Sequence, residues 1–361
     1  MYLRTLNCIM NKELINQIKI TPLLDTLQLE DISDSEYFSN KYSNYISNSR
    51  LGLLLSKGVK AFFEGFHSQE YNPSYFFGSL LHQQYLQPES FEVIDNVFTP
   101  TAKARLMALE LYKDDGSMPT DDEIKIASYK IGYYKDKLTP NRIVELREKC
   151  NPFWRDKFLY DQQNTKTDKE QIFVDEKSYN LLKCCLESIN NNEDFEKLIH
   201  PKGLIEDPYS ANERTILLDV QIDIPGYDSK VFKLKSKLDN FTVDPEENVI
   251  TVNDLKTTSK LAKEFDPDYF HYQRELGMYS YLLKLCAKKF FNLDNPKIKG
   301  NFLVISTIPD YKSLVYPMTS KLFKSGFNEF RYLLQCVAYY NIVEGYEFIN
   351  RDGNNILRCC K

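Results

Sequence analysis

The sequence lacks the long apolar runs that anchor a protein in a membrane. No stretch of its 361 residues approaches the ~18 uninterrupted apolar residues that a membrane span needs. Residues 1–19 are interrupted by polar and charged side chains (Arg4, Asn7, Asn11, Lys12 and Glu13), which a secretory signal peptide would not tolerate. We therefore expect no membrane partner.

Cysteine is present without the spacing that builds a disulfide or zinc framework. None of the 8 cysteines forms a Cys-x-x-Cys pair, and two pairs are vicinal, Cys184–Cys185 and Cys359–Cys360. A chain of this length with this spacing is typical of reduced thiols. This composition predicts a cytoplasmic protein.

Several enzyme signatures and an excess of positive charge are also missing. The sequence has no Gly-x-x-x-x-Gly-Lys-[Ser/Thr] phosphate loop and no Gly-x-Ser-x-Gly nucleophile elbow, which argues against a helicase motor and a serine hydrolase. The formal net charge is -5, from 46 basic and 51 acidic residues. A nucleic-acid partner would therefore have to be held by a local basic channel rather than by general attraction.

What is present is ordinary globular composition, with 42% hydrophobic, 27% charged and 14% aromatic residues. Residues 1–45 show no strong period and are interpreted as an N-terminal extension with a solvated acidic patch. Helical spacing of apolar residues begins near Ile46 and again near Pro73. Residues 101–200 are predicted to be several helices joined by polar turns, and residues 351–361 a tail.

The later half of the chain changes to the alternating pattern of β-strands. Strands are predicted over 215–224, 231–238, 249–255, 301–308 and 314–316, with helices over about 267–291 and 320–344. This order, β-β-β-α-β-β-α, predicts an α/β fold with a sheet packed by helices. The turn at 244–248 pairs the second and third of these strands as a hairpin.

Two carboxylates and a lysine meet at one end of that hairpin. Asp239 is predicted to end one strand, and Asp254 lies late on the next, with Lys256 two positions beyond on the same face. Asp239 and Asp254 are hard oxygen ligands suited to Mg²⁺ or Mn²⁺, and the carbonyl of Leu255 offers a further oxygen. Lys256 is placed to position or help deprotonate a water molecule, or to neutralise developing charge.

A structural interpretation is also open, because an Asp and a Lys two residues apart at a strand end commonly form a surface ion pair.

The preceding strand has Lys233, Lys235 and Lys237 on one side, either as a phosphate-binding stripe or as a solvated face. The two alternatives are equally consistent with the sequence.

The segment Asp239…Asp254-Leu-Lys256-Thr-Thr resembles the nuclease core of the PD-(D/E)XK superfamily, most closely its RecB-like and RecE-like phage exonucleases. Leu238 stands where the superfamily name expects proline. The resemblance implies a restriction-endonuclease-like core: a central mixed β-sheet flanked by helices over 205–345, within a nuclease domain of residues 46–350 that carries a large helical insertion at 101–200.

Three more motifs resemble that branch and imply roles for their residues. Gly78-Ser-Leu-Leu-His82 resembles an element whose histidine binds the metal, and Asn212-Glu213 resembles one that places another acid near it. The helix segment from Tyr272 to Tyr279 resembles a Gln-x-x-x-Tyr motif. The resemblance implies catalytic roles for Gln273 and Tyr279 and a phosphate contact for Arg274. The spacing departs from the motif, so Gln273 and Glu275 both remain candidates for the glutamine role.

The resemblance further implies a metal-dependent deoxyribonuclease that digests linear DNA from its ends in phage-type recombination or replication. It implies a single-strand annealing protein as partner and a ring-shaped homo-oligomer. No iron–sulfur cluster is expected, because Cys359 and Cys360 are adjacent and cannot easily bind separate irons. A structure-specific endonuclease or junction resolvase, and a non-catalytic derivative that binds DNA or protein, stay open as alternatives.

Overall fold

The structure is a computed structural model that describes residues 12–64, 73–95, 102–132, 138–163, 169–199, 210–269 and 271–348. The chain forms two compact units. We call residues 1–67 with 188–361 the sheet unit, and residues 68–187 the helical unit. The expected tail at 351–361 lies outside the described residues.

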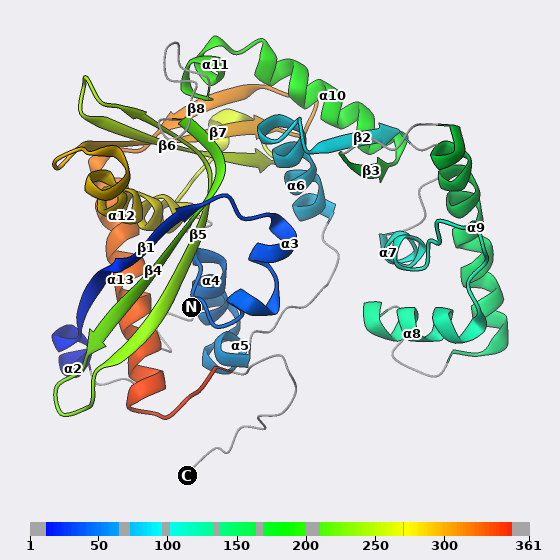
Figure 1. The fold of residues 1–361 in the computed structure, drawn as a ribbon. Coiled ribbons are helices and arrows are strands. Elements are labelled where there is room, and N and C mark those ends of the chain that lie inside the picture. Colours follow the sequence, from blue (N-terminus) through cyan, green and yellow to red (C-terminus); the bar gives the residue numbers. More distant parts are fainter. Residues whose placement is uncertain are drawn as a thin grey trace. The chain divides into compact units, whose positions relative to one another are not determined.

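The sheet unit is built on a six-stranded sheet in the order β1-β4-β5-β6-β7-β8 (Figure 1). Its strands are β1 (Lys19–Glu30), β4 (Ser210–Asp223), β5 (Lys230–Asp244), β6 (Val249–Thr258), β7 (Lys297–Ser306) and β8 (Ser313–Pro317). All neighbours are antiparallel except β6 and β7, which are parallel. A parallel pair needs a crossover connection, and α12 (Tyr272–Phe291) supplies it.

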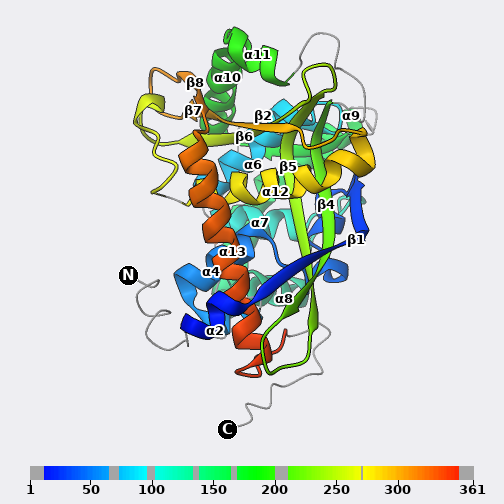
Figure 2. The ribbon, with the colours of Figure 1, turned by 90° about the vertical axis from the view of Figure 1, so that its left-hand side faces the viewer.

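Two long helices, α12 and α13 (Ser320–Ile342), cross each other on the sheet (Figure 2). They meet at Gly277 and Gly326. A Cβ atom on Gly326 would lie 1.8 Å from the carbonyl oxygen of Gln273, so only glycine permits this approach of the two backbones. Leu276, Met278 and Leu282 of α12 are fully buried in the core between helices and sheet.

Shorter elements complete the sheet unit. They are α2 (Lys12–Gln17), α3 (Asp34–Tyr37), η1 (Asn40–Tyr42), α4 (Asn48–Lys57), α5 (Val59–Glu64), α11 (Glu193–Ile199) and η2 (Ala262–Glu264). The Ser47 side chain accepts from the backbone N–H of Arg50 and so caps α4.

The predicted order of elements in the later half is confirmed, as is the hairpin between β5 and β6. The sequence did not predict β1, which forms within residues 1–45 and occupies an edge of the sheet. Its pairing with β4 shifts register between Leu23 and Gln28. Such a bulge interrupts the alternation of buried and exposed side chains on which strand prediction depends.

The helical unit contains the helices expected after residue 101. Its elements are α6 (Pro73–Leu86), β2 (Phe91–Asp95), α7 (Ala102–Glu110), α8 (Asp121–Ile131), α9 (Pro140–Gln163), β3 (Glu170–Val174) and α10 (Glu176–Asn190). The unit begins before residue 101 and contains α6 with the Gly78–His82 element. Strands β2 and β3 pair in parallel and were not predicted, since five residues are too few to show a period.

None of the described helices is both long and apolar enough to cross a membrane. Within the described ranges Cys150, Cys184, Cys185, Cys286 and Cys336 are free thiols.

Candidate metal centre

Three acids lie in one row across neighbouring strands of the sheet unit. The pairs Asn212–Asn240 and Arg214–Leu238 place Glu213 of β4 opposite Asp239 of β5. The pair Asn240–Asn253 places Asp254 of β6 next to Asp239 on the other side. Residues that lie opposite each other on neighbouring strands point to the same face of the sheet. The side chains of the three acids are therefore expected on one face.

The row lies where the backbone pairing of the sheet is interrupted. The prediction that Asp239 ends its strand is wrong, because β5 continues to Asp244. What ends beside Asp239 is the pairing of β5 with β6, whose last pair is Asn240–Asn253. Strand pairing stops there because the Asp239 carboxylate takes the place of a backbone acceptor: its Oδ2 accepts from the N–H of Leu255 at 2.7 Å.

Glu213 has a backbone conformation that residues other than glycine rarely adopt. Its φ is +53°, in the left-handed region, within an otherwise regular strand. Carboxylate oxygens of Glu213 and Asp239 approach within 4.8 Å of each other. A non-glycine residue held at positive φ is a strain that usually persists where it serves a site.

Lys256 is clamped between two carboxylates. Its Nζ lies 2.9 Å from Oδ1 and 2.8 Å from Oδ2 of Asp254, and 2.9 Å from Oε2 of Glu275 on α12. The hydroxyl of Tyr279 donates to Oε1 of Glu275 at 3.1 Å. The predicted common face of Asp254 and Lys256 is confirmed, and Glu275, one turn before Tyr279, joins them.

Burial and neighbouring charge set the protonation of this cluster. Asp254 is fully buried, and burial raises its pKa well above the ordinary value, with the carboxylates of Glu275 and Asp239 adding to the rise. Burial alone would lower the pKa of Lys256, but Asp254, Glu275 and Asp239 outweigh it and hold that pKa above its usual value. Lys256 is therefore an ammonium ion at neutral pH.

A second lysine, Lys237, contacts the row from the side of β5. Its Nζ lies 3.5 Å from Oε2 of Glu213 and is also paired with Asp34 of α3. Local sequence patterns could not predict the contact of Asp34 with Lys237, because the two residues are more than two hundred positions apart in the chain. The predicted acidic patch is thus solvated only in part.

The donor set fits a hard divalent cation. Glu213, Asp239, Asp254 and Glu275 supply four carboxylates against the two ammonium groups of Lys237 and Lys256. Among the described residues, no well-aligned hydrogen bond reaches the buried Oδ2 of Asp254, although Nζ of Lys256 lies 2.8 Å away. Carboxylate oxygens are the donors that hard divalent cations prefer, so the residues present fit such an ion better than a soft one.

The structure corrects two predicted roles on α12. The Gln273 side chain donates to Oε2 of Glu329 at 3.1 Å, and Arg274 pairs with Oε1 of Glu329 at 3.0 Å. Arg274 is only 5% exposed and also donates to Asn48 of α4 at 2.7 Å. Both side chains are used within the helix packing, so a phosphate contact by Arg274 is wrong, and Glu275 rather than Gln273 contacts Lys256.

The predicted lysine stripe is also corrected in part. Lys235 is 8% exposed, its Nζ donates to the carbonyl oxygen of Tyr37 at 2.7 Å, and it lies 4.1 Å from the Tyr37 ring centroid. Lys237 is engaged by Asp34 and Glu213 as described above. Of the three lysines, Lys233 is the exposed one, with its Nζ 5.5 Å from the Tyr45 ring centroid.

His82 is half-buried on α6. It belongs to the helical unit, whereas the acid row belongs to the sheet unit. A metal-binding role for His82 therefore stays a prediction, as does the use of the Leu255 carbonyl as a ligand.

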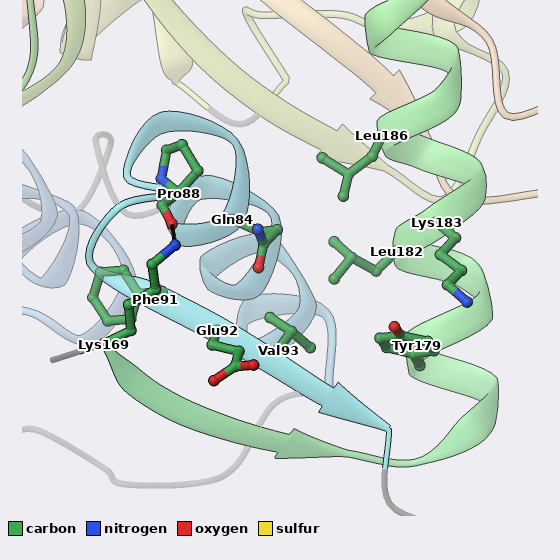
Figure 3. A pocket seen from close by; sticks show the side chains of 10 residues that line it. All are labelled: Gln84, Pro88, Phe91, Glu92, Val93, Lys169, Tyr179, Leu182, Lys183 and Leu186. Carbon is green, nitrogen blue, oxygen red and sulfur yellow. Dashed lines mark hydrogen bonds between the residues drawn. The ribbon is translucent and has the colours of Figure 1, made fainter. Parts of the chain in front are cut away.

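The helical unit has a pocket of its own, of about 460 Å³, between α10, the end of α6 and β2 (Figure 3). Leu182, Leu186 and Val93 form an apolar lining, and Glu92 is the one carboxylate among the lining residues. Nζ of Lys169 donates a hydrogen bond to the carbonyl oxygen of Pro88 at 2.9 Å. This pocket has no cluster of acids, so it offers no comparable metal-binding chemistry.

No protein-family model matches the sequence, and a comparison with curated proteins finds no similar one. Solved structures that resemble the chain include the following two. One, a "putative exonuclease" from Eubacterium rectale, is 11% identical over 91% of this chain and 95% of its own, with a TM-score of 0.37. The other, the protein SSO0001, is 14% identical over 74% and 88%, with a TM-score of 0.21. Likeness at this level supports no argument about function, which has to come from the site.

Proposed function

We propose that the protein is a metal-dependent deoxyribonuclease whose centre is formed by Glu213, Asp239, Asp254 and Lys256. The single observation that supports this most is the acid row itself: three carboxylates in register across β4, β5 and β6, with a clamped ammonium beside them. Gathering this many charged groups at buried and partly buried positions is costly, and such clusters are common at functional sites.

A divalent cation bound by these carboxylates would supply Lewis-acid polarisation of a phosphodiester and lower the pKa of a water molecule. The remaining roles are assigned to side chains of the protein itself. Lys256 is placed to orient a water molecule or to neutralise charge on the phosphate. Glu275 and Tyr279 hold the Lys256 ammonium in place.

For the mode of action we propose digestion of linear DNA from its ends in phage-type recombination or replication, with an annealing protein as partner and a ring of subunits that encloses the DNA. The support is the motif resemblance and the net charge of -5, which favours enclosure over general attraction. A ring also agrees with the closed symmetry of most homo-oligomers.

The test is cleavage of end-labelled linear duplex and of covalently closed circles, each with Mg²⁺ and with Mn²⁺. We expect the linear duplex to shorten progressively while the circles survive. Rapid linearisation of the circles would show an endonuclease and would leave the metal centre intact.

Two variants test the site. Asp254→Ala and Lys256→Ala should remain folded and lose about 10²-fold or more in cleavage rate, because each removes stabilisation of the transition state. Lys230→Ala, an exposed lysine at the start of β5 with no assigned role, is the matched control and should keep the cleavage rate within a few-fold. Full activity in folded Asp254→Ala would contradict the site, and no cleavage by the wild type with either metal would favour a non-catalytic binding protein.

A further inference from the structure

Four asparagine side chains form a continuous ladder directly beside the acid row. Nδ2 of Asn240 donates to Oδ1 of Asn212 at 2.8 Å, Nδ2 of Asn253 donates to Oδ1 of Asn240 at 2.7 Å, and Nδ2 of Asn301 donates to Oδ1 of Asn253 at 2.9 Å. The ladder therefore crosses β4, β5, β6 and β7 in a single row of paired residues.

Each acid of the row has a ladder asparagine as its chain neighbour. Glu213 follows Asn212, Asp239 precedes Asn240, and Asp254 follows Asn253. Since successive residues of a strand point to opposite faces, the amides lie on one face and the carboxylates on the other. Asn240 and Asn253 are fully buried, and Asn253 also donates to the carbonyl oxygen of Leu198 on α11 at 3.2 Å.

The ladder crosses the sheet where the backbone holds the acids least firmly. Between β4 and β5 the regular pairing skips Glu213 and Asp239, and between β5 and β6 it ends at Asn240–Asn253. Asn240 lies in the paired row directly next to Asp239, and its side chain forms a hydrogen bond to each of the two neighbouring strands. Between β6 and β7, in contrast, backbone pairing continues past Asp254 to Thr258.

We propose that Asn240 and Asn253 are positioning residues that fix the spacing of Glu213, Asp239 and Asp254 for cation binding. The inference rests on the proposed metal centre. A side-chain amide that donates to one strand and accepts from the next holds three strands at one separation, so the three carboxylates on the opposite face keep one geometry. Fixed supporting groups of this kind raise the affinity of a metal site because its ligands do not need to be ordered on binding.

The ladder contains its own matched control. Asn301→Ala removes one side-chain hydrogen bond of the same kind, between β6 and β7. Backbone pairing between these two strands is intact there, and the residue of β7 beside Asp254 is Phe302 rather than an acid. Asn240→Ala removes the two bonds that flank Asp239. Asn240→Ser serves as a second, milder variant if Asn240→Ala does not fold.

Two readouts on the full-length protein test the proposal: the affinity for Mn²⁺ by calorimetry, and hydrogen exchange of the Leu255 amide without metal, which reports the bond to Asp239. We expect Asn240→Ala, or Asn240→Ser, to lose about 10-fold or more in Mn²⁺ affinity. Leu255 exchange should accelerate by a similar factor. Asn301→Ala should change both by less than about 3-fold, even at a comparable loss of thermal stability.

Equal changes in the Asn240 and Asn301 variants, in proportion to their loss of stability, would overturn the proposal and make the ladder a general support of the sheet. Unchanged Leu255 exchange in a folded Asn240 variant would overturn it as well. If the wild type neither binds Mn²⁺ nor cleaves DNA, the proposed function fails, while Leu255 exchange still decides whether the ladder positions Asp239.

Discussion

The two units differ most in what they bury. In the described part of the chain, the buried polar and charged residues of the sheet unit include Lys235, Asn240, Asn253, Asp254 and Arg274, whereas the helical unit has Ser128. The helical unit instead closes around an apolar core that contains Met107, Ile124, Phe153 and Trp154.

This contrast indicates where the chemistry lies. An apolar core stabilises its unit through burial alone, whereas buried charges must be paired at a cost that a purely structural unit has no reason to bear. The polar groups of the sheet unit are organised rather than scattered, with a row of acids on one face of β4–β6 and a row of amides on the other. The helical unit has the features of a scaffold with one predicted exception, His82.

The largest expected effect concerns His82, because a metal-binding role for it would contradict the description of the helical unit as a scaffold. If His82 is a ligand of the same metal, His82→Ala should lower the affinity for Mn²⁺ by about 10-fold or more, since even residues that only support ligands cost 10–100-fold when they are removed. Calorimetric titration measures this. Gln83→Ala, on the same helix and similarly half-buried, is the control. Equal affinities for the two variants would confine the site to the sheet unit.

The packing of α12 against α13 offers a second test, because α12 carries Glu275, which contacts Lys256. Gly326→Ala should cost about 1–3 kcal/mol in the free energy of unfolding, since its Cβ would meet the backbone of Gln273 and one helix must move. Denaturant titration gives the free energy, and cleavage should fall in the same variant as Glu275 shifts. The exposed neighbour Ser325→Ala should stay within about 0.5 kcal/mol of the wild type. A Gly326→Ala protein as stable as that control would contradict the close packing.

The smallest effect concerns the helical unit and pH. The side-chain hydrogen bond from Lys113 and the bonds from Thr120 lower the pKa of Glu123 to about 2, below its ordinary 4.5. A lowered pKa stabilises the fold above pH 4.5 and loses that contribution as the pH falls towards 2. Glu123→Gln should therefore lower the melting temperature slightly at pH 7, with the difference shrinking below pH 4.5. Glu148→Gln, on an exposed face of α9, is the control variant measured at the same pH values.

Local patterns explain why the later half of the fold was predictable. Alternation in β5 and β6, the turn at 244–248 and the apolar spacing of α12 and α13 are all signals within a few residues of one another. The edge strand β1 was not predictable because its bulge breaks the alternation, and β2 and β3 are too short to show one. The acids and the lysine at the centre could be identified because Asp239, Asp254 and Lys256 all lie on one hairpin.

The chemical type of the candidate site could be predicted from residues close together in the sequence, because two carboxylates lie on one hairpin and a lysine follows the second by two residues. The groups from distant parts of the chain that complete the site could be identified only in the folded structure. Glu275 of α12 contacts Lys256 of β6, Asp34 of α3 contacts Lys237 of β5, and Gln273 and Arg274 contact Glu329 instead. The physical reason is that strand and helix periods specify which face a side chain takes, whereas its partner on that face is set by packing between elements far apart in the chain.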